Sequence, residues 1–133
     1  MDNKSIYQSY IANSQLNVQK YQGQINNLKE FKKENEKGAQ EFSRAIQKRR
    51  NKVNNTTSSF TKSPLLKKID NKLSSELDKG SENKVNGYFE QVSDEVDRVI
   101  KSLEGKIAQE NSNIESYQNS ISIIEAQEAS KWS

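Results

Sequence analysis

Apolar residues recur every seven positions through the first part of the chain, and a second apolar position follows each by three residues. This heptad repeat is typical of a long amphipathic helix. Its a positions are Ile11, Val18, Ile25, Lys32, Ala39, Ile46 and Val53, and its d positions are Tyr7, Tyr21, Leu28, Asn35, Phe42 and Arg49. The pattern stops at Asn54 and Asn55, where turn-forming residues follow. We therefore predict a helix over about residues 5–54.

A second heptad repeat runs toward the C-terminus. Its a positions are Ile100, Ile107, Ile114 and Ile121, and its d positions are Phe89, Val96, Leu103, Glu110, Tyr117 and Ile124. A row of valines at position g (Val85, Val92 and Val99) widens the apolar face beyond what one partner helix would cover. We predict a second long helix over about residues 83–129.

The connector, residues 55–80, carries a weaker helical signal. Ser63 can cap a helix whose first residue is Pro64. An apolar face continues down to Gly80 through Leu66, Ile69, Leu73 and Leu77. We predict a short third helix in this connector. Alternatively, the segment prolongs the second long helix, because Gly80 and Gly87 weaken a helix without forbidding it.

Composition decides how these helices pack. Hydrophobic residues make up 31% of the 133 residues, charged residues make up 29%, and the mean hydropathy is −1.06. So little apolar material cannot build a thick core, but it suits helices that bury a narrow stripe. Disorder is the other interpretation of such polarity, and the ordered repeats argue against it for most of the chain. We predict an all-α, elongated, coiled-coil-like antiparallel hairpin that forms a single domain over residues 1–133.

Polar residues interrupt both apolar stripes, at Lys32 and Asn35 in the first and at Glu110 in the second. A turn near residue 71 would place Lys32 opposite Glu110 and pair their charges. Polar residues at a and d positions commonly set the register of a coiled coil. We therefore predict a register-setting role for these three residues; simple solvent exposure is the alternative.

The formal net charge of +3 is small, and lysine and glutamate are interspersed along both halves. This distribution argues against binding to nucleic acid. The exception is a basic cluster of Lys48, Arg49, Arg50 and Lys52. Its position near the predicted end of the first helix favours compensation of the helix dipole over a phosphate-binding patch.

Residues that carry catalysis or bind metals are scarce. The chain contains no histidine and no cysteine, and its five glycines lie singly, so neither a thiolate or imidazole site nor a phosphate-binding glycine loop is available. The densest acidic cluster surrounds Asp94 and Asp97, and it lacks the spacing of a calcium loop. We predict no enzymatic activity, no cofactor and no metal.

No apolar run approaches the roughly 20 residues of a membrane span, and the N-terminus leads into polar sequence instead of a signal-peptide core. We therefore expect a cytoplasmic protein without membrane insertion, whose export would not use a cleavable signal.

Two aromatic residues, Phe60 and Trp132, fall outside the heptad stripes, and an aromatic near a helix end often anchors a partner. The alternatives are a local capping contact for Phe60 and a disordered tail for Trp132. The residues that we predict to bind a partner are Phe60, Leu66, Ile69, Leu73, Leu77, Val85, Val92, Val99 and Trp132.

Two segments of the arms carry a resemblance to a known family: 25–30 (INNLKE) in the first, and 99–107 (VIKSLEGKI) together with Tyr88 and Phe89 in the second. With this arm order and a tryptophan near the C-terminus, the chain resembles the YwqH-like family over nearly its whole length. These are small helical proteins of Gram-positive bacteria, typically encoded beside LXG toxins of the type VII secretion system.

The resemblance implies an adaptor or targeting chaperone that binds the N-terminal helical domain of a cognate LXG toxin, with a second small helical accessory protein as a further partner. It also implies co-export through the type VII system. Two features depart from related hairpins: no Trp-x-Gly turn occurs, and Tyr117 is not followed four residues later by an acidic residue. We therefore do not assign the export signal to this chain.

Two other classes of function compete with the adaptor. The same heptads would serve a self-associating structural coiled coil, which a stable homo-oligomer would reveal. An amphipathic protein of membrane surfaces is less well supported, because the polar faces hold asparagine, serine and glutamate as well as lysine.

Overall fold

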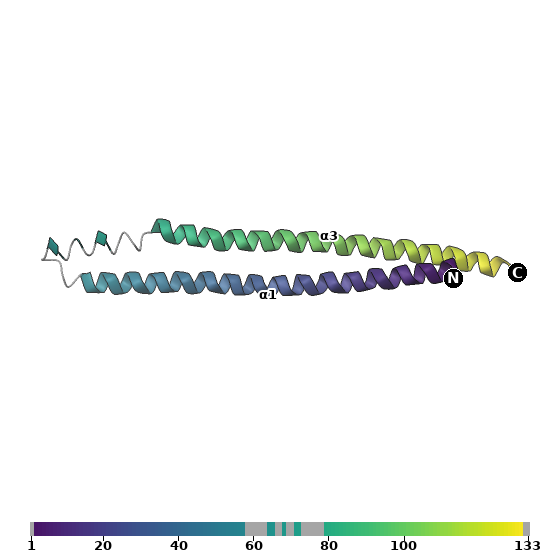
Figure 1. The fold of residues 1–133 in the computed structure, drawn as a ribbon, viewed down its shortest axis with the longest axis horizontal. Helices are drawn as coiled ribbons and strands as arrows, with labels where there is room; N and C mark the ends of the chain where they lie inside the picture. The colour runs from purple at the N-terminus through teal and green to yellow at the C-terminus, as the bar shows by residue number, and fades with distance from the viewer. Residues whose placement is uncertain (1, 58–63, 66–67, 69–70, 73–78, 132–133) are drawn as a thin grey trace. The chain divides into compact units, whose positions relative to one another are not determined.

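The computed structural model describes residues 2–57, 64–65, 68, 71–72 and 79–131, and in these the chain forms two long α-helices and no strand (Figure 1). Helix α1 spans Asn3–Thr57 with 55 residues, and helix α3 spans Lys79–Lys131 with 53 residues. The predicted all-α class and the packing of two long helices against each other are confirmed. The observed helix ends lie two to four residues beyond the predicted ones.

The short connector helix that the sequence predicted is not shown. Its capping residue Ser63 and the leucines and isoleucine of its apolar face lie outside the described residues. Helix α3 begins at Lys79 and continues through Gly80 and Gly87, which shows that these glycines do not interrupt the helix.

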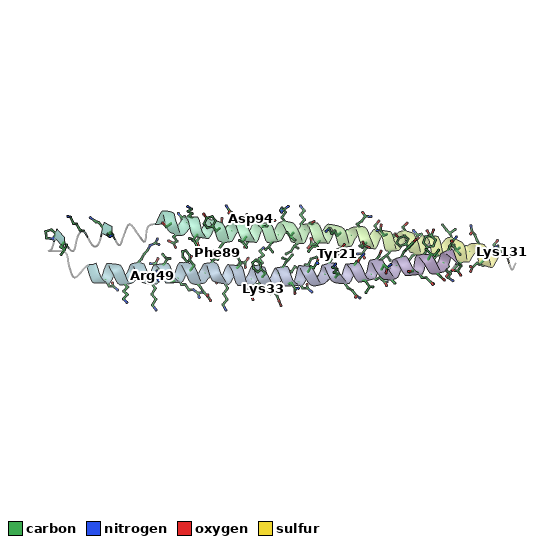
Figure 2. The ribbon with its side chains drawn as sticks, viewed as in Figure 1. Tyr21, Lys33, Arg49, Phe89, Asp94 and Lys131 are labelled. Carbon is green, nitrogen blue, oxygen red and sulfur yellow. The ribbon has the colours of Figure 1, made fainter. Side chains whose placement is uncertain are left out.

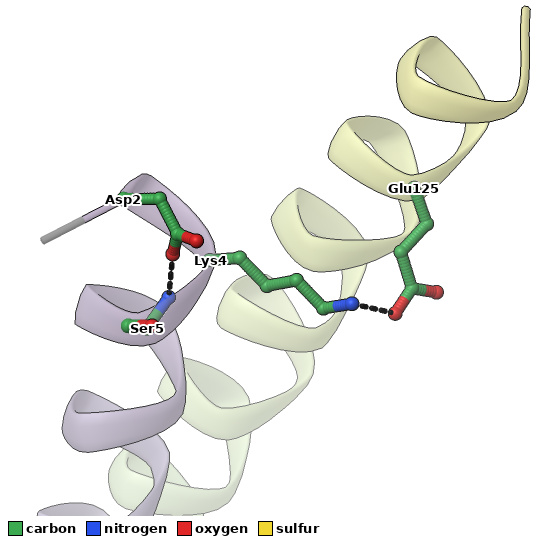
Figure 3. Close-up of polar contacts among 4 residues, drawn as sticks. All are labelled: Asp2, Lys4, Ser5 and Glu125. Carbon is green, nitrogen blue, oxygen red and sulfur yellow. Dashed lines mark hydrogen bonds and ion pairs between the residues drawn. The ribbon is translucent and has the colours of Figure 1, made fainter. Parts of the chain in front are cut away.

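Asp2 caps the N-terminus of α1 (Figure 3). The backbone N–H of Ser5 donates a 2.7 Å hydrogen bond to Oδ1 of Asp2, and the N–H of Ile6 donates to the Asp2 carbonyl at 3.3 Å. Aspartate is among the preferred residues at this position, because its side chain satisfies a backbone donor that the helix leaves unpaired. The bond from the Ser5 N–H lowers the pKa of Asp2 below its usual value.

The chain divides into two compact units, and each pairs a stretch of α1 with a stretch of α3. Unit 1 comprises Met1–Glu30 and Asp97–Ser133, and unit 2 comprises Phe31–Val96. The single domain expected over residues 1–133 stays a prediction.

Within unit 1 the two stretches run antiparallel. Nζ of Lys4 lies 3.0 Å from Oε1 of Glu125 (Figure 3), and Asn17, further along α1, contacts Glu110, which lies earlier on α3. The buried residues among those described in this unit are Ser14, Ile25, Ile100 and Leu103. Near the start of α1, Tyr7, Tyr10 and Tyr117 form a cluster of rings with centroids 5.3 to 6.3 Å apart.

Unit 2 is also antiparallel, because Asn35 meets Phe89 and Ser93 while Arg50, later on α1, meets Glu82, earlier on α3. The rings of Phe42 and Phe89 pack with centroids 6.4 Å apart. Figure 2 shows Phe89 between the two helices of this unit.

The heptad stripes predicted from the sequence form the buried seam in both units. All a and d residues assigned between Tyr7 and Ile46 and between Phe89 and Ile124 are buried or half-buried. Arg49, which the pattern assigned to position d, is exposed. Its neighbour Arg50 is half-buried instead, and its guanidinium lies 2.6 Å from the carboxylate of Glu82. A member of the basic cluster therefore makes an ion pair between the helices.

Candidate protein-binding surface

The predicted pairing of Lys32 with Glu110 is wrong. Asn17 Nδ2 donates a 3.5 Å hydrogen bond to Oε1 of Glu110 within unit 1. Lys32 lies about 22 Å further along α1 at 1.5 Å per residue, which is beyond the reach of the Glu110 side chain. The contacting pairs of each unit are centred on about residue 64, as with Asn35 and Ser93. The register centred on residue 71 that the pairing assumed is therefore also wrong.

Asn35 makes the polar contact between the helices of unit 2. Its Nδ2 donates 2.9 Å to the carbonyl oxygen of Phe89 and 3.1 Å to Oγ of Ser93. Both bonds are partly buried and join residues that are distant in the sequence, so they tie α1 to α3 at one level. This geometry suits the register-setting role predicted for Asn35, although the register is set against Ser93 and not against Glu110.

The valine row predicted to bind a partner is only partly covered. Val85 is half-buried, whereas Val92 and Val99 remain 38% and 36% exposed. The other residues predicted to bind a partner lie outside the described residues: Phe60, Leu66, Ile69, Leu73, Leu77 and Trp132.

In unit 2 an apolar row on α1 accompanies the valines on α3. Phe31, Gly38 and Ala45 occupy position g of the first heptad repeat, and Phe31 is 49% exposed. In an antiparallel helix pair the g positions of both helices lie on the same side of the seam. The close approach of Gly38 to Phe89 agrees with this placement, since an added Cβ at Gly38 would lie 3.6 Å from Cε1 of Phe89. We call this side the g flank, defined by Phe31, Gly38, Ala45, Val85 and Val92.

The opposite side of the same seam, at position e, is polar. On α1 it carries Glu36, Ser43 and Arg50, and on α3 it carries Asn83 and Glu90. Arg50 is the half-buried partner of Glu82. Since one side is apolar and the other is charged, unit 2 offers a single side on which a further helix could bury apolar surface.

The sequence reasoning identified the valines but missed their counterparts on α1. Phe31, Gly38 and Ala45 lie seven residues apart, so the signal was present in the sequence. It was overlooked because only one of the three is a large apolar residue. The placement of both g rows on one side also depends on the antiparallel arrangement of the helices.

Unit 1 presents exposed apolar side chains without a comparable stripe. Tyr10, Leu16, Val99 and Ile123 are exposed. Leu16 and Ile123 occupy positions f and c, and Val99, at g like Tyr10, lies 18 residues before Tyr117 on α3, about 27 Å at 1.5 Å per residue. Tyr10 packs on Tyr117, and Nζ of Lys106 lies 5.7 Å from the ring centroid of Tyr21. The apolar residues of this unit therefore do not converge on one surface.

Among the described residues, no group of three or more acidic side chains is arranged to hold a metal ion. Every buried side-chain nitrogen or oxygen in the described part has a hydrogen-bond partner. Neither α1 nor α3 contains a stretch of described residues apolar enough to cross a membrane.

Comparisons with protein-family models, with curated proteins and with solved structures give no match to this chain.

Proposed function

We propose that this protein is a non-enzymatic helical adaptor, or targeting chaperone, that binds the N-terminal helical domain of a cognate LXG toxin for type VII secretion. The observation that supports a binding role is the g flank of unit 2, which stays exposed at Phe31 and Val92 beside a fully formed seam. A helix pair with one apolar side gains buried surface when a partner's helices complete the bundle.

The identity of the partner rests on the resemblance to the YwqH-like family. In this proposal the adaptor meets its toxin in the cytoplasm and accompanies it to the secretion machinery, together with a second small helical accessory protein. No catalytic group takes part, and the adaptor acts through helix packing alone.

Coexpression with a cognate LXG toxin tests the proposal. The tagged adaptor and the N-terminal helical domain of the toxin should copurify and elute together at a defined stoichiometry in size-exclusion chromatography with light scattering. The isolated adaptor should be monomeric or only loosely associated. Separate elution of the two proteins would refute the toxin-binding role, and a stable homo-oligomer of the adaptor would favour a self-associating coiled coil.

A further inference from the structure

The g flank forms a continuous strip because the register of unit 2 brings its two rows level. Asn35 at position d of α1 contacts Ser93 at position a of α3. In an antiparallel pair one residue forward on α1 corresponds to one residue back on α3, so Gly38, three residues after Asn35, lies within two residues, or about 3 Å, of the level of Val92, one residue before Ser93. One heptad further, Ala45 and Val85 lie equally close in level.

Small residues make the middle of this strip shallow on the α1 side. Gly38 has no side chain, and the ring of Phe89 lies 3.6 Å from the position that a Cβ would occupy there. A partner side chain can therefore approach the half-buried Phe89, with Val92 beside it and Phe31 at one end. An exposed large aromatic next to small residues and valines is the pattern of a helix-binding surface.

Carboxylates border the strip. The next row outward, position c, holds Glu34 and Glu41 on α1 and Glu95 on α3, all of them exposed. Lys48 is the basic residue of this row, and it lies at one end. Tyr88, 54% exposed, extends the border on α3 with apolar surface. A helix lying on the g flank would thus meet two carboxylates along its α1 edge, and Tyr88 with Glu95 along its α3 edge.

We propose that the g flank of unit 2 binds one amphipathic helix of the partner, with an apolar stripe flanked by lysine or arginine. This inference rests on the proposed adaptor function and specifies its surface. Basic residues on the edge that faces α1 complement Glu34 and Glu41. A second copy of the chain fits less well, because it would bring its own Glu34 and Glu41 against the same border.

A labelled synthetic helix of about three heptads, with leucine at a and d and lysine at e and g, is the probe. Fluorescence anisotropy should show that it binds the full chain, and that raising the salt concentration to about 0.5 M weakens binding several-fold. Val92→Glu should weaken binding about tenfold or more. Gln91→Glu adds the same charge at the next, exposed position on the other side of α3, and it should leave binding within about twofold.

The border is tested by reversing its charge. The double variant Glu34→Lys with Glu41→Lys should no longer bind the lysine-flanked helix. It should instead bind a matched helix that carries glutamate at e and g. The control Glu36→Lys with Glu90→Lys makes the same charge change on the polar side, so it should keep the original preference. Circular dichroism checks that every variant remains helical.

Absence of binding to the lysine-flanked helix, or equal loss in Val92→Glu and Gln91→Glu, would overturn the proposal. So would a homodimer of the wild-type chain that Val92→Glu dissociates, since a second copy would then occupy the g flank. The proposed function is tested separately by coexpression. A toxin complex that still forms with Val92→Glu would show that the g flank is not the binding surface, while the adaptor role would remain supported.

Discussion

Asn35 is the residue whose chemistry ties the two helices of unit 2 together. Its amide donates to Phe89 and Ser93, and a carboxylate could not donate to the Phe89 carbonyl oxygen. Asn35→Asp keeps the size and removes the donor, so we expect it to lower the free energy of unfolding by about 1–3 kcal/mol. Urea denaturation followed by circular dichroism measures this change.

Asn27→Asp is the matched control for that substitution. Asn27 is exposed on the same helix, and the same change there should alter the free energy of unfolding by about 0.5 kcal/mol or less. Equal effects at both positions would show that the helix tolerates aspartate poorly in general and that the Asn35 contacts add nothing.

The stability of the start of α1 should depend on pH through Asp2 and Lys4, which act in opposite directions. The bonds from Ser5 lower the pKa of Asp2 from about 3.8, so the cap's stabilisation is present above that pH and is lost as pH falls through the lowered value. The hydrogen bond to Glu125, and then its charge, raise the pKa of Lys4 from about 10.5. That contribution is present below pH 10.5 and disappears as pH rises through the raised value.

The Ser5 amide gives a direct measurement of the cap by NMR. Its chemical shift should titrate below about pH 3.8 in the wild-type chain. Asp2→Asn keeps a side-chain oxygen that can accept the Ser5 bond and removes the titrating group, so its Ser5 shift should stay flat. The same titration in both proteins would show that another group causes it.

At the scale of single residues, the sequence identified the seam well and its polar contacts poorly. Burial at a and d follows from periodicity, which is why Ile25 is only 2% exposed and Val96 and Leu103 are buried as expected. Which donor meets which acceptor depends on the level at which the helices face each other. Neither the bonds of Asn35 nor the Asn17–Glu110 contact could be derived from spacing along one helix.

At the scale of the helices, glycines inside α1 and α3 lower helix stability. Gly38 and Gly87 lie inside α1 and α3, where glycine is less favourable than alanine by roughly 0.5–1 kcal/mol. An added Cβ at Gly87 meets nothing within 4 Å, and at Gly38 it meets the Phe89 ring at an ordinary contact distance. Gly38→Ala and Gly87→Ala should therefore each raise the free energy of unfolding by about that amount.

Thermal and urea unfolding of the two alanine variants would check this. Stabilisation by Gly87→Ala together with destabilisation by Gly38→Ala would mean that Phe89 cannot accept a methyl group beside it. That result would contradict the 3.6 Å spacing at this position.

The lengths of the two helices were predictable, because both the heptad repeat and the point where it stops can be read from neighbouring residues. The ends of α1 and α3 fall close to where the repeats stop, and the cap at Asp2 is likewise a local signal. The pattern of one helix alone does not show which side of the helix pair is apolar on both helices. The valines at g form part of an apolar side only because the antiparallel arrangement places the g positions of α1 beside them.

At the scale of the whole molecule, the quantity that periodicity leaves undetermined is the register between the arms. A shift of two heptads keeps every a position opposite a d position, so the seam looks equally good before and after it. The sequence prediction differed from the structure by about that amount. It relied on pairing Lys32 with Glu110, whereas the structure pairs Glu110 with Asn17.

Paired cysteines distinguish the two registers, and the chain's lack of natural cysteine makes the readout clean. Asn17→Cys with Glu110→Cys should be joined efficiently by a short bifunctional maleimide, because the native side chains approach to 3.5 Å. Lys32→Cys with Glu110→Cys shares one position, and it should not react within one chain, because Lys32 lies about 22 Å further along α1. Intramolecular cross-linking, read as a shifted band on denaturing gels and by mass spectrometry at high dilution, should therefore favour the first pair. Preferential cross-linking of the second pair would support the register expected from charge pairing. In that register Gly38 would no longer lie near Val92, so the two apolar rows of the g flank would not face the same partner helix.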